Sequence, residues 1–200
     1  MLLNNAEIVL ATHNKGKIPE ISALVEPFGC IVSCAGDYGV SEPIEDGDTF
    51  EANALLKAWH TAKATGKIAM ADDSGICVVG LDNAPGIYSA RYAGQSKDFN
   101  IAMKRIEDEL NEKGTDEKGA FFVCSLAVVN PTTGEELVFR GEVHGNLTFP
   151  ARGDKGFGYD PIFIPNGYDI TFAEMDADKK HSISHRADAF NKMKETCFAK

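Results

Sequence analysis

Residues 71–76 of the 200-residue chain read Ala-Asp-Asp-Ser-Gly-Ile and directly follow an apolar run over residues 68–70. An apolar run that changes abruptly to acids predicts a strand whose carboxyl end projects Asp72 and Asp73, and open α/β sheets usually hold their chemistry at that end. Paired carboxylates suit Mg2+, which takes oxygen ligands and keeps several waters for a phosphate-bearing substrate. The same residue types also build ordinary turns, so this stretch alone leaves both interpretations open.

The segment from Glu7 to Phe28 predicts a strand, a loop and a helix in that order. Residues 7–11 form an apolar strand, and apolar residues recur at helical spacing from Ile18 onwards. The loop at residues 12–17, Thr-His-Asn-Lys-Gly-Lys, would present backbone N–H groups and basic side chains to an anion at a helix amino terminus. It lacks the GxxxxGK[ST] pattern of a Walker loop, and most loops of this type bind nothing.

An acidic loop precedes the second predicted helix, which spans residues 49–64. Either Asp48 or Thr49 can cap this helix, because an acid follows at the spacing of a capping box. Favourable placement at the positive end of the helix dipole is enough to explain Asp46 and Asp48. Glu45 stands further back and remains available to reach into a site.

The pattern of strands indicates an α/β fold with a mixed sheet. Short strands are expected over residues 68–71 and 76–79, on either side of the acid pair. Residues 120–129 are the most strongly apolar strand, and a turn at 130–134 returns the chain into residues 136–143 as an antiparallel hairpin. Further helices are expected over residues 98–112 and at the carboxyl end.

A glycine-bearing loop at residues 153–161 is a candidate for ligand contact. Glycines on both sides of Phe157 let the backbone approach a flat ligand closely while the ring stacks on it. The alternative is a glycine hairpin loop whose phenylalanine belongs to the core.

The basic stretch at residues 179–186 leads into the last predicted helix. Ser182 or Ser184 can cap that helix, which would place His185 and Arg186 in its first turn. The cations of this stretch then either address an anion or simply form a solvated surface.

Composition narrows the class of protein. Twenty basic and 30 acidic residues give a net charge of −10, which disfavours binding to a nucleic acid polymer, because that affinity rests on phosphate neutralisation. No basic leader or 18-residue apolar run is present, so no membrane partner and a cytoplasmic location are expected. The five cysteines show no CxxC pair and are expected to be reduced core thiols. The length and apolar content predict a single domain over residues 1–200.

Together these stretches resemble the inosine triphosphate pyrophosphatase family, also called XTP/dITP diphosphatases. The matching motifs follow the family order along essentially the whole chain. They are [Ser/Thr]-x-Asn-x-x-Lys at 12–17, Thr-Phe-x-x-Asn-Ala-x-x-Lys-Ala at 49–58, Asp-Asp-Ser-Gly at 72–75, Ala-Pro-Gly-x-Tyr-Ser-Ala-Arg-Tyr at 84–92, Gly-Phe-Gly-Tyr-Asp-Pro at 156–161 and Lys-x-x-x-Ser-His-Arg at 180–186.

The resemblance implies an elongated two-lobed α/β fold around a long mixed sheet with flanking helices and a central cleft, usually as a homodimer. It also implies Mg2+-dependent hydrolysis of XTP, ITP and dITP to the nucleoside monophosphate and pyrophosphate, which clears deaminated purines from the nucleotide pool. Glu45 and Asp73 would bind the metal, and Asp73 would also be the general base, although spacing does not decide between Asp72 and Asp73. The implied substrate-binding residues are Thr12, His13, Asn14, Lys15, Gly16, Lys17, Ser74, Phe157, Gly158, Tyr159, Asp160, Lys180, His185 and Arg186.

Two alternatives to this function remain at the level of sequence. A Maf-like pyrophosphatase would act on other nucleotides, and the stretch at 180–186 together with Phe157 argues against it. A nucleotide sensor without turnover would use the same pocket. The carboxylates of Glu45, Asp72 and Asp73 argue against the sensor, because a binder of polyanions gains nothing from acids unless a cation is present.

Overall fold

The computed structural model describes residues 1–12 and 17–198. Four residues that are expected to bind substrate, His13, Asn14, Lys15 and Gly16, lie outside the described residues, and so does the side chain of Lys17. The predictions for these five residues therefore stay predictions.

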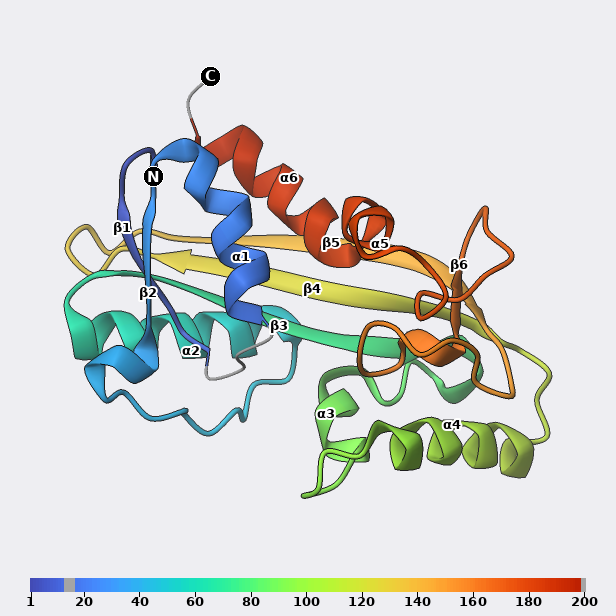
Figure 1. Cartoon of the computed structure of the whole chain (residues 1–200). Helices are drawn as coiled ribbons and strands as arrows, with labels where there is room; N and C mark the ends of the chain where they lie inside the picture. The colour runs from blue at the N-terminus through green and yellow to red at the C-terminus, as the bar shows by residue number, and fades with distance from the viewer. Residues whose placement is uncertain (13–16, 199–200) are drawn as a thin grey trace. The chain divides into compact units, whose positions relative to one another are not determined.

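The described strands form one mixed sheet with flanking helices (Figure 1). Its order is β2-β1-β3-β4-β5-β6; β1 pairs in parallel with β2 and β3, and β5 pairs antiparallel with β6. This arrangement confirms the predicted α/β class and the mixed sheet. The strands are β1 (Glu7–Leu10), β2 (Ile31–Cys34), β3 (Ile68–Val78), β4 (Gly119–Val129), β5 (Glu136–Leu147) and β6 (Phe163–Pro165).

The α-helices agree with the helical periodicity of the sequence in most places. They are α1 (Lys17–Val25), α2 (Phe50–Thr65), α3 (Ser89–Tyr92), α4 (Phe99–Lys113), α5 (Ala177–Ile183) and α6 (His185–Cys197). The basic stretch at 179–186 is divided between α5 and α6, whereas the sequence predicted a single helix after it. None of the helices in the described ranges is both long and apolar enough to cross a lipid bilayer.

The chain forms two compact units. The first holds residues 1–73, 124–141 and 189–200, and the second holds residues 74–123 and 142–188. The core of the second unit is rich in aromatic rings; Phe122, for example, contacts Phe163 and Phe172 with ring centroids 4.8 and 6.1 Å apart.

Side chains of the sheet in the first unit alternate between two different cores. Met70 packs with Ile21 of α1 and with Phe190 and Met193 of α6. Because successive residues of a strand face opposite sides, the neighbours of Met70 face the other way and pack beneath α2. That second core consists almost entirely of small side chains: Ala54, Ala58 and Ala62 of α2, Ala69 and Ala71 of β3, and Ala127 and Val129 of β4.

The acid pair does not end a strand, which corrects the first sequence-based prediction. Residues 68–78 form one continuous strand, β3, with Asp72 and Asp73 in its middle. The strand that ends at this point is β1: Leu10 pairs with Met70, and a last backbone hydrogen bond of 2.8 Å joins Ala11 N to the carbonyl oxygen of Met70. The acids therefore lie beside the carboxyl end of β1, while β4 remains the neighbour of β3 on its other side.

The thiols behave as predicted. All five cysteines are reduced, and all except the half-buried Cys34 are buried. Burial raises the pKa of Cys30 and of Cys197 above the ordinary value, because the thiolate loses hydration. These side chains serve as small core residues.

The close contact between α2 and the sheet predicts an asymmetric response to larger side chains. Ala58 is fully buried, so Ala58→Leu should overpack the contact and lower the free energy of unfolding by about 1–3 kcal/mol. Ala64→Leu, at an exposed position of the same helix, is the matched control and should leave it nearly unchanged. Urea denaturation measures both, and equal losses in the two variants would contradict the packing argument.

Candidate active site

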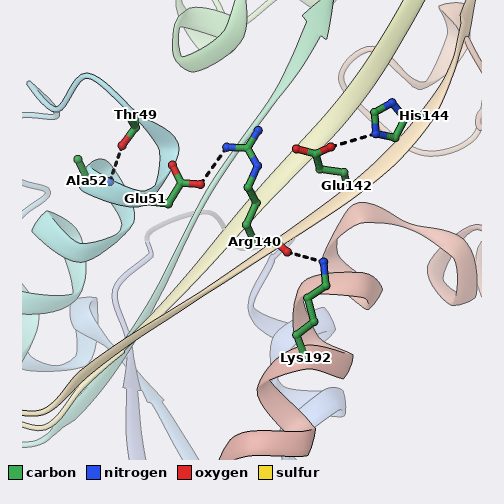
Figure 2. A network of polar contacts seen from close by, with 7 residues as sticks. All are labelled: Thr49, Glu51, Ala52, Arg140, Glu142, His144 and Lys192. Atoms are coloured by element: carbon green, nitrogen blue, oxygen red, sulfur yellow. Dashed lines mark hydrogen bonds and ion pairs between the residues drawn. The ribbon is translucent and has the colours of Figure 1, made fainter.

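The amino terminus of α2 is anchored by two polar contacts (Figure 2). Thr49 is the helix cap, since its hydroxyl accepts a 3.1 Å hydrogen bond from Ala52 N, which decides between the two caps predicted. In the first turn, Glu51 accepts a 2.9 Å hydrogen bond from Arg140 of β5. The carbonyl oxygen of Arg140 in turn accepts a 2.8 Å hydrogen bond from Lys192 of α6. The start of α2 is thereby tied to the sheet.

Asn53 and Lys57, one turn apart on α2, hold Asp73 and Glu45 together. The ammonium nitrogen of Lys57 lies 2.9 Å from an oxygen of Asp73 and 2.9 Å from an oxygen of Glu45. The Asn53 amide nitrogen lies 3.4 Å from the second oxygen of Asp73, and its amide oxygen accepts a 2.9 Å bond from Gly47 N. A Cβ at Gly47 would lie 2.7 Å from that amide oxygen, so the loop carrying Glu45 requires glycine there.

Burial and charge act in opposite directions on Lys57. Burial favours the neutral amine, but the carboxylates of Asp73, Glu45 and Asp72 outweigh it and hold the pKa of Lys57 above its ordinary value. The side chain is 13% exposed, and that of Asp73 is 11% exposed. A nearly buried carboxylate is thus neutralised by a nearly buried ammonium that stays charged at neutral pH.

A pocket of about 130 Å³ opens beside this cluster. Its lining includes Thr12, Glu45, Lys57 and Asp72. A water needs only about 10–15 Å³ of such space, so the pocket is large enough for several waters or one phosphate group. The structure thus brings three residues singled out from the sequence, Thr12, Glu45 and Asp72, together with Lys57 around one pocket of the first unit.

The glycine-bearing loop forms a second polar cluster, which lies within the second unit. Asp160 is buried, and one of its carboxylate oxygens accepts hydrogen bonds from Phe157 N, at 2.8 Å, and from the ammonium of Lys180. A Cβ at Gly156, whose φ is +73°, would lie 2.1 Å from that oxygen, so this tight turn needs glycine. The turn leaves the Phe157 ring 53% exposed, which excludes the core-phenylalanine alternative.

The Phe157 ring and the Lys180 ammonium lie close together. The nitrogen of Lys180 is 4.7 Å from the centroid of the Phe157 ring and 5.7 Å from that of Phe172. One face of a flat, exposed ring is therefore supported by a cation, an arrangement worth about 0.5–2 kcal/mol. The exposed ring is available for stacking on a ligand.

Tyr159 supports the loop from below. Its hydroxyl donates a 2.7 Å hydrogen bond to the carbonyl oxygen of Ser89, and Phe99 packs edge-on against its ring. Burial raises the pKa of Tyr159, so the hydroxyl stays protonated and keeps donating. Ser89 is itself fixed, because its side-chain oxygen accepts a 2.9 Å bond from Ile76 N.

The remaining predicted residues lie in ordered elements. Ser184 caps α6 by accepting a 3.2 Å bond from Ala187 N, which places His185 and Arg186 in the first turn as expected. The His185 ring stacks on Phe122 with centroids 5.1 Å apart, and Arg186 is 7% exposed. Ser74 lies half-buried in β3.

The sequence and the fold both resemble those of known proteins. The chain matches the model of the Ham1 family over residues 8–196. The chain belongs to the Ham1 family. It is 49% identical over 196 residues to a dITP/XTP pyrophosphatase of Zymomonas mobilis, covering 98% of this chain and 93% of that one. For a dITP/XTP pyrophosphatase of Caulobacter vibrioides the identity is 52% over 193 residues, covering 96% and 98%.

A solved structure supports the same assignment for this Ham1 chain. The HAM1 protein from Coxiella burnetii matches it with a TM-score of 0.90 at 35% identity, over 98% of each chain. The resemblance to XTP/dITP diphosphatases that was identified from six motifs is therefore confirmed.

Sequence reasoning missed Asn53 and Lys57 as members of the site. Both stand inside the motif at residues 49–58, four positions apart, so they share one side of α2. Polar residues at helical spacing within a recognised motif were the available signal. What they contact could not be inferred, because Glu45 and Asp73 are distant in the sequence.

The pair formed by Glu51 and Arg140 predicts a stability difference that depends on pH. Partial burial is the largest single effect and opposes ionisation of Glu51, but the hydrogen bond and charge of Arg140, together with hydrogen bonds from the backbone and from Ser125, outweigh it and hold the pKa of Glu51 below its ordinary value. A carboxyl of this kind stabilises the fold above its unfolded pKa of about 4.3, and that contribution is lost as the pH falls through the folded value. Urea denaturation should show that Glu51→Gln costs up to about 1 kcal/mol near neutral pH and nothing in strong acid. Equal losses at both would contradict this account.

Proposed function

We propose that the protein hydrolyses dITP, XTP and ITP, with Mg2+, to the nucleoside monophosphate and pyrophosphate. The observation that carries the proposal is the convergence of Glu45 and Asp73 on the Lys57 ammonium. It occurs in a chain that is 49% and 52% identical to two proteins named dITP/XTP pyrophosphatases. This combination supports an enzyme that acts on a polyphosphate bound through a cation.

The donor set suits Mg2+. Carboxylate oxygens of Glu45 and Asp73 each lie 2.9 Å from one ammonium nitrogen, so they already converge on a single cation. Among the described residues no third acid, histidine or cysteine joins them, and Mg2+ commonly binds one or two carboxylates while waters and substrate phosphates complete its shell. When bound, Mg2+ would offset phosphate charge and acidify a coordinated water.

Asp73 is the proposed general base. Hydrolysis forms a bond between the water oxygen and the α-phosphorus, breaks the bond from that phosphorus to the bridging oxygen, and releases pyrophosphate. The water proton passes to the Asp73 carboxylate, whose orientation is held by Asn53 and Lys57. The charge of Lys57, together with that predicted for Lys15 and Lys17, would stabilise the departing phosphates.

The glycine-bearing loop of the second unit supplies the proposed contacts for a purine base. The exposed Phe157 ring provides a stacking surface backed by Lys180. Inosine and xanthosine carry a keto oxygen at the six-position, whereas adenine carries an amino group. Donors such as His185 and Arg186 would pair with the keto oxygen, and adenine would leave a donor unpaired at a cost of about 1–3 kcal/mol.

The wider assignments follow from the resemblance. We propose that residues 1–200 act as one pyrophosphatase domain, because the family match spans residues 8–196 across both compact units. The role in clearing deaminated purines, the homodimer and the cytoplasmic location stay predictions. Sedimentation equilibrium tests the homodimer directly.

A single assay tests the activity and the base. Pyrophosphate release from XTP, ITP and dITP with Mg2+ should exceed release from ATP, GTP and dTTP, and chelation of the metal should abolish it. Asp73→Asn should lower kcat by about 100-fold or more, because the water loses its proton acceptor. Asp72→Asn is the matched control, since it removes the neighbouring carboxylate.

Three outcomes would contradict the proposal. Comparable turnover of ATP and ITP would exclude the proposed base selectivity. A full rate for Asp73→Asn combined with a lost rate for Asp72→Asn would move the general base to Asp72. Tight binding of XTP without any pyrophosphate release would favour the sensor.

Loss of the stacking surface should appear in KM. Phe157→Ala removes a ring whose stacking on a base is worth about 1–3 kcal/mol, so KM for XTP should rise about tenfold or more with little change in kcat. Ile101→Ala, at another exposed apolar position of the second unit, should change neither constant. A fall in kcat without any change in KM would contradict a stacking role.

A further inference from the structure

We propose that Lys57 is an internal counter-ion that occupies the cation position between Glu45 and Asp73 and has to leave it when a divalent metal binds. The inference rests on the proposed function, because it uses the same two carboxylates as metal ligands. It adds that metal binding in this protein is an exchange of one cation for another.

The geometry leaves room for one cation at a time. The Lys57 nitrogen lies 2.9 Å from an oxygen of Glu45 and 2.9 Å from an oxygen of Asp73. Mg2+ approaches its oxygen ligands to about 2.1 Å, so an ion shared by these oxygens would lie in the volume that the ammonium now fills. Two positive charges at that separation repel strongly, and little solvent is present to screen them.

The neighbouring pocket gives the ammonium a place to move to. Lys57 lines this pocket of about 130 Å³ together with Glu42, Ser41 and Thr61, whose oxygens can accept hydrogen bonds from an ammonium. The stem of lysine has four flexible carbons, so a change of rotamer suffices. Phosphate oxygens of a bound nucleotide would be stronger acceptors, so nucleotide and metal should favour each other's binding.

The carboxylates do not depend on Lys57 alone for their positions. Asn53 contacts the second oxygen of Asp73 and accepts a hydrogen bond from Gly47 N, in the loop that carries Glu45. Removing the ammonium should therefore leave two closely spaced, ordered carboxylates that have lost one positive charge between them. Such a site should bind a divalent cation more tightly than the wild-type site does.

Binding of Mn2+ to the nucleotide-free protein tests this exchange. Electron paramagnetic resonance of the unbound ion should show that Lys57→Met binds Mn2+ about tenfold or more tightly than wild type. Lys57→Arg keeps the positive charge and should bind no more tightly than wild type. Lys63→Met removes an exposed lysine from the same helix and controls for the change in net charge. Glu45→Gln should weaken binding.

The outcomes separate this inference from the proposed function. If Glu45→Gln weakens Mn2+ binding but Lys57→Met leaves it unchanged or weaker, the exchange is wrong while the metal site stands. If Glu45→Gln binds Mn2+ as wild type does, the proposed metal site fails and the exchange fails with it. A tightening by Lys63→Met equal to that by Lys57→Met would reduce the effect to overall charge and overturn the exchange.

A second measurement needs no uncharged variant at residue 57. In wild-type protein labelled with 15N at the lysine side-chain nitrogens, the buried Lys57 ammonium should give a protected signal, assigned by its absence in Lys57→Arg. Saturating Mg2+ without nucleotide should shift or remove that signal. A signal that is unchanged at saturating Mg2+ would overturn the proposal.

Discussion

The close contact between α2 and the sheet is the constraint on which the site in the first unit depends. Ala54, Ala58 and Ala62 share one core of small buried side chains with Ala69 and Ala71. Small side chains in this core let α2 pack closely on the sheet, so Asn53 and Lys57 of the helix reach Asp73 of β3. The alanines are therefore as necessary to the site as the polar residues that they position.

The polar cluster around Asp73 also offsets the energetic cost of burying that carboxylate. Asp73 is 8% exposed, and an unpaired carboxylate at such a depth would be strongly destabilising. The ammonium of Lys57 and the amide of Asn53 compensate for the lost hydration. Because Lys57 and Asn53 already satisfy this carboxylate, the binding of a metal that we propose for Asp73 would have to replace contacts that stabilise the folded protein.

The second unit also contains a buried ion pair, formed by Asp160 and Lys180, which stabilises a turn. The carboxylate of Asp160 is buried and accepts both a backbone N–H and the ammonium of Lys180. These two hydrogen bonds hold the turn in place, and the exposed Phe157 ring then lies over the Lys180 ammonium. In both units a buried carboxylate is paired with a lysine ammonium, and this pair fixes the local arrangement of side chains.

The sequence alone determined the features that depend on neighbours along the chain. Helical periodicity predicted α1, a capping box predicted the start of α2, and an apolar run followed by a turn predicted the β4–β5 hairpin. Thr49 and Ser184 were each one of two caps that the sequence allowed. Six short motifs were enough to identify the family. Each of these signals extends over a few residues, where local backbone preference and hydrophobic spacing act directly.

Only the tertiary structure decided the features that depend on residues far apart in the sequence. β3 continues through its acids because a strand persists where a neighbouring strand pairs with it, and this partner comes from residues 119–129. Lys57 joins Glu45, 12 positions before it, to Asp73, 16 positions after it, and no local pattern encodes that convergence. The exposure of Phe157 likewise depends on Lys180 of α5, which binds Asp160 in the same turn. Burial is set by what packs around a residue, and not by its neighbours in the sequence.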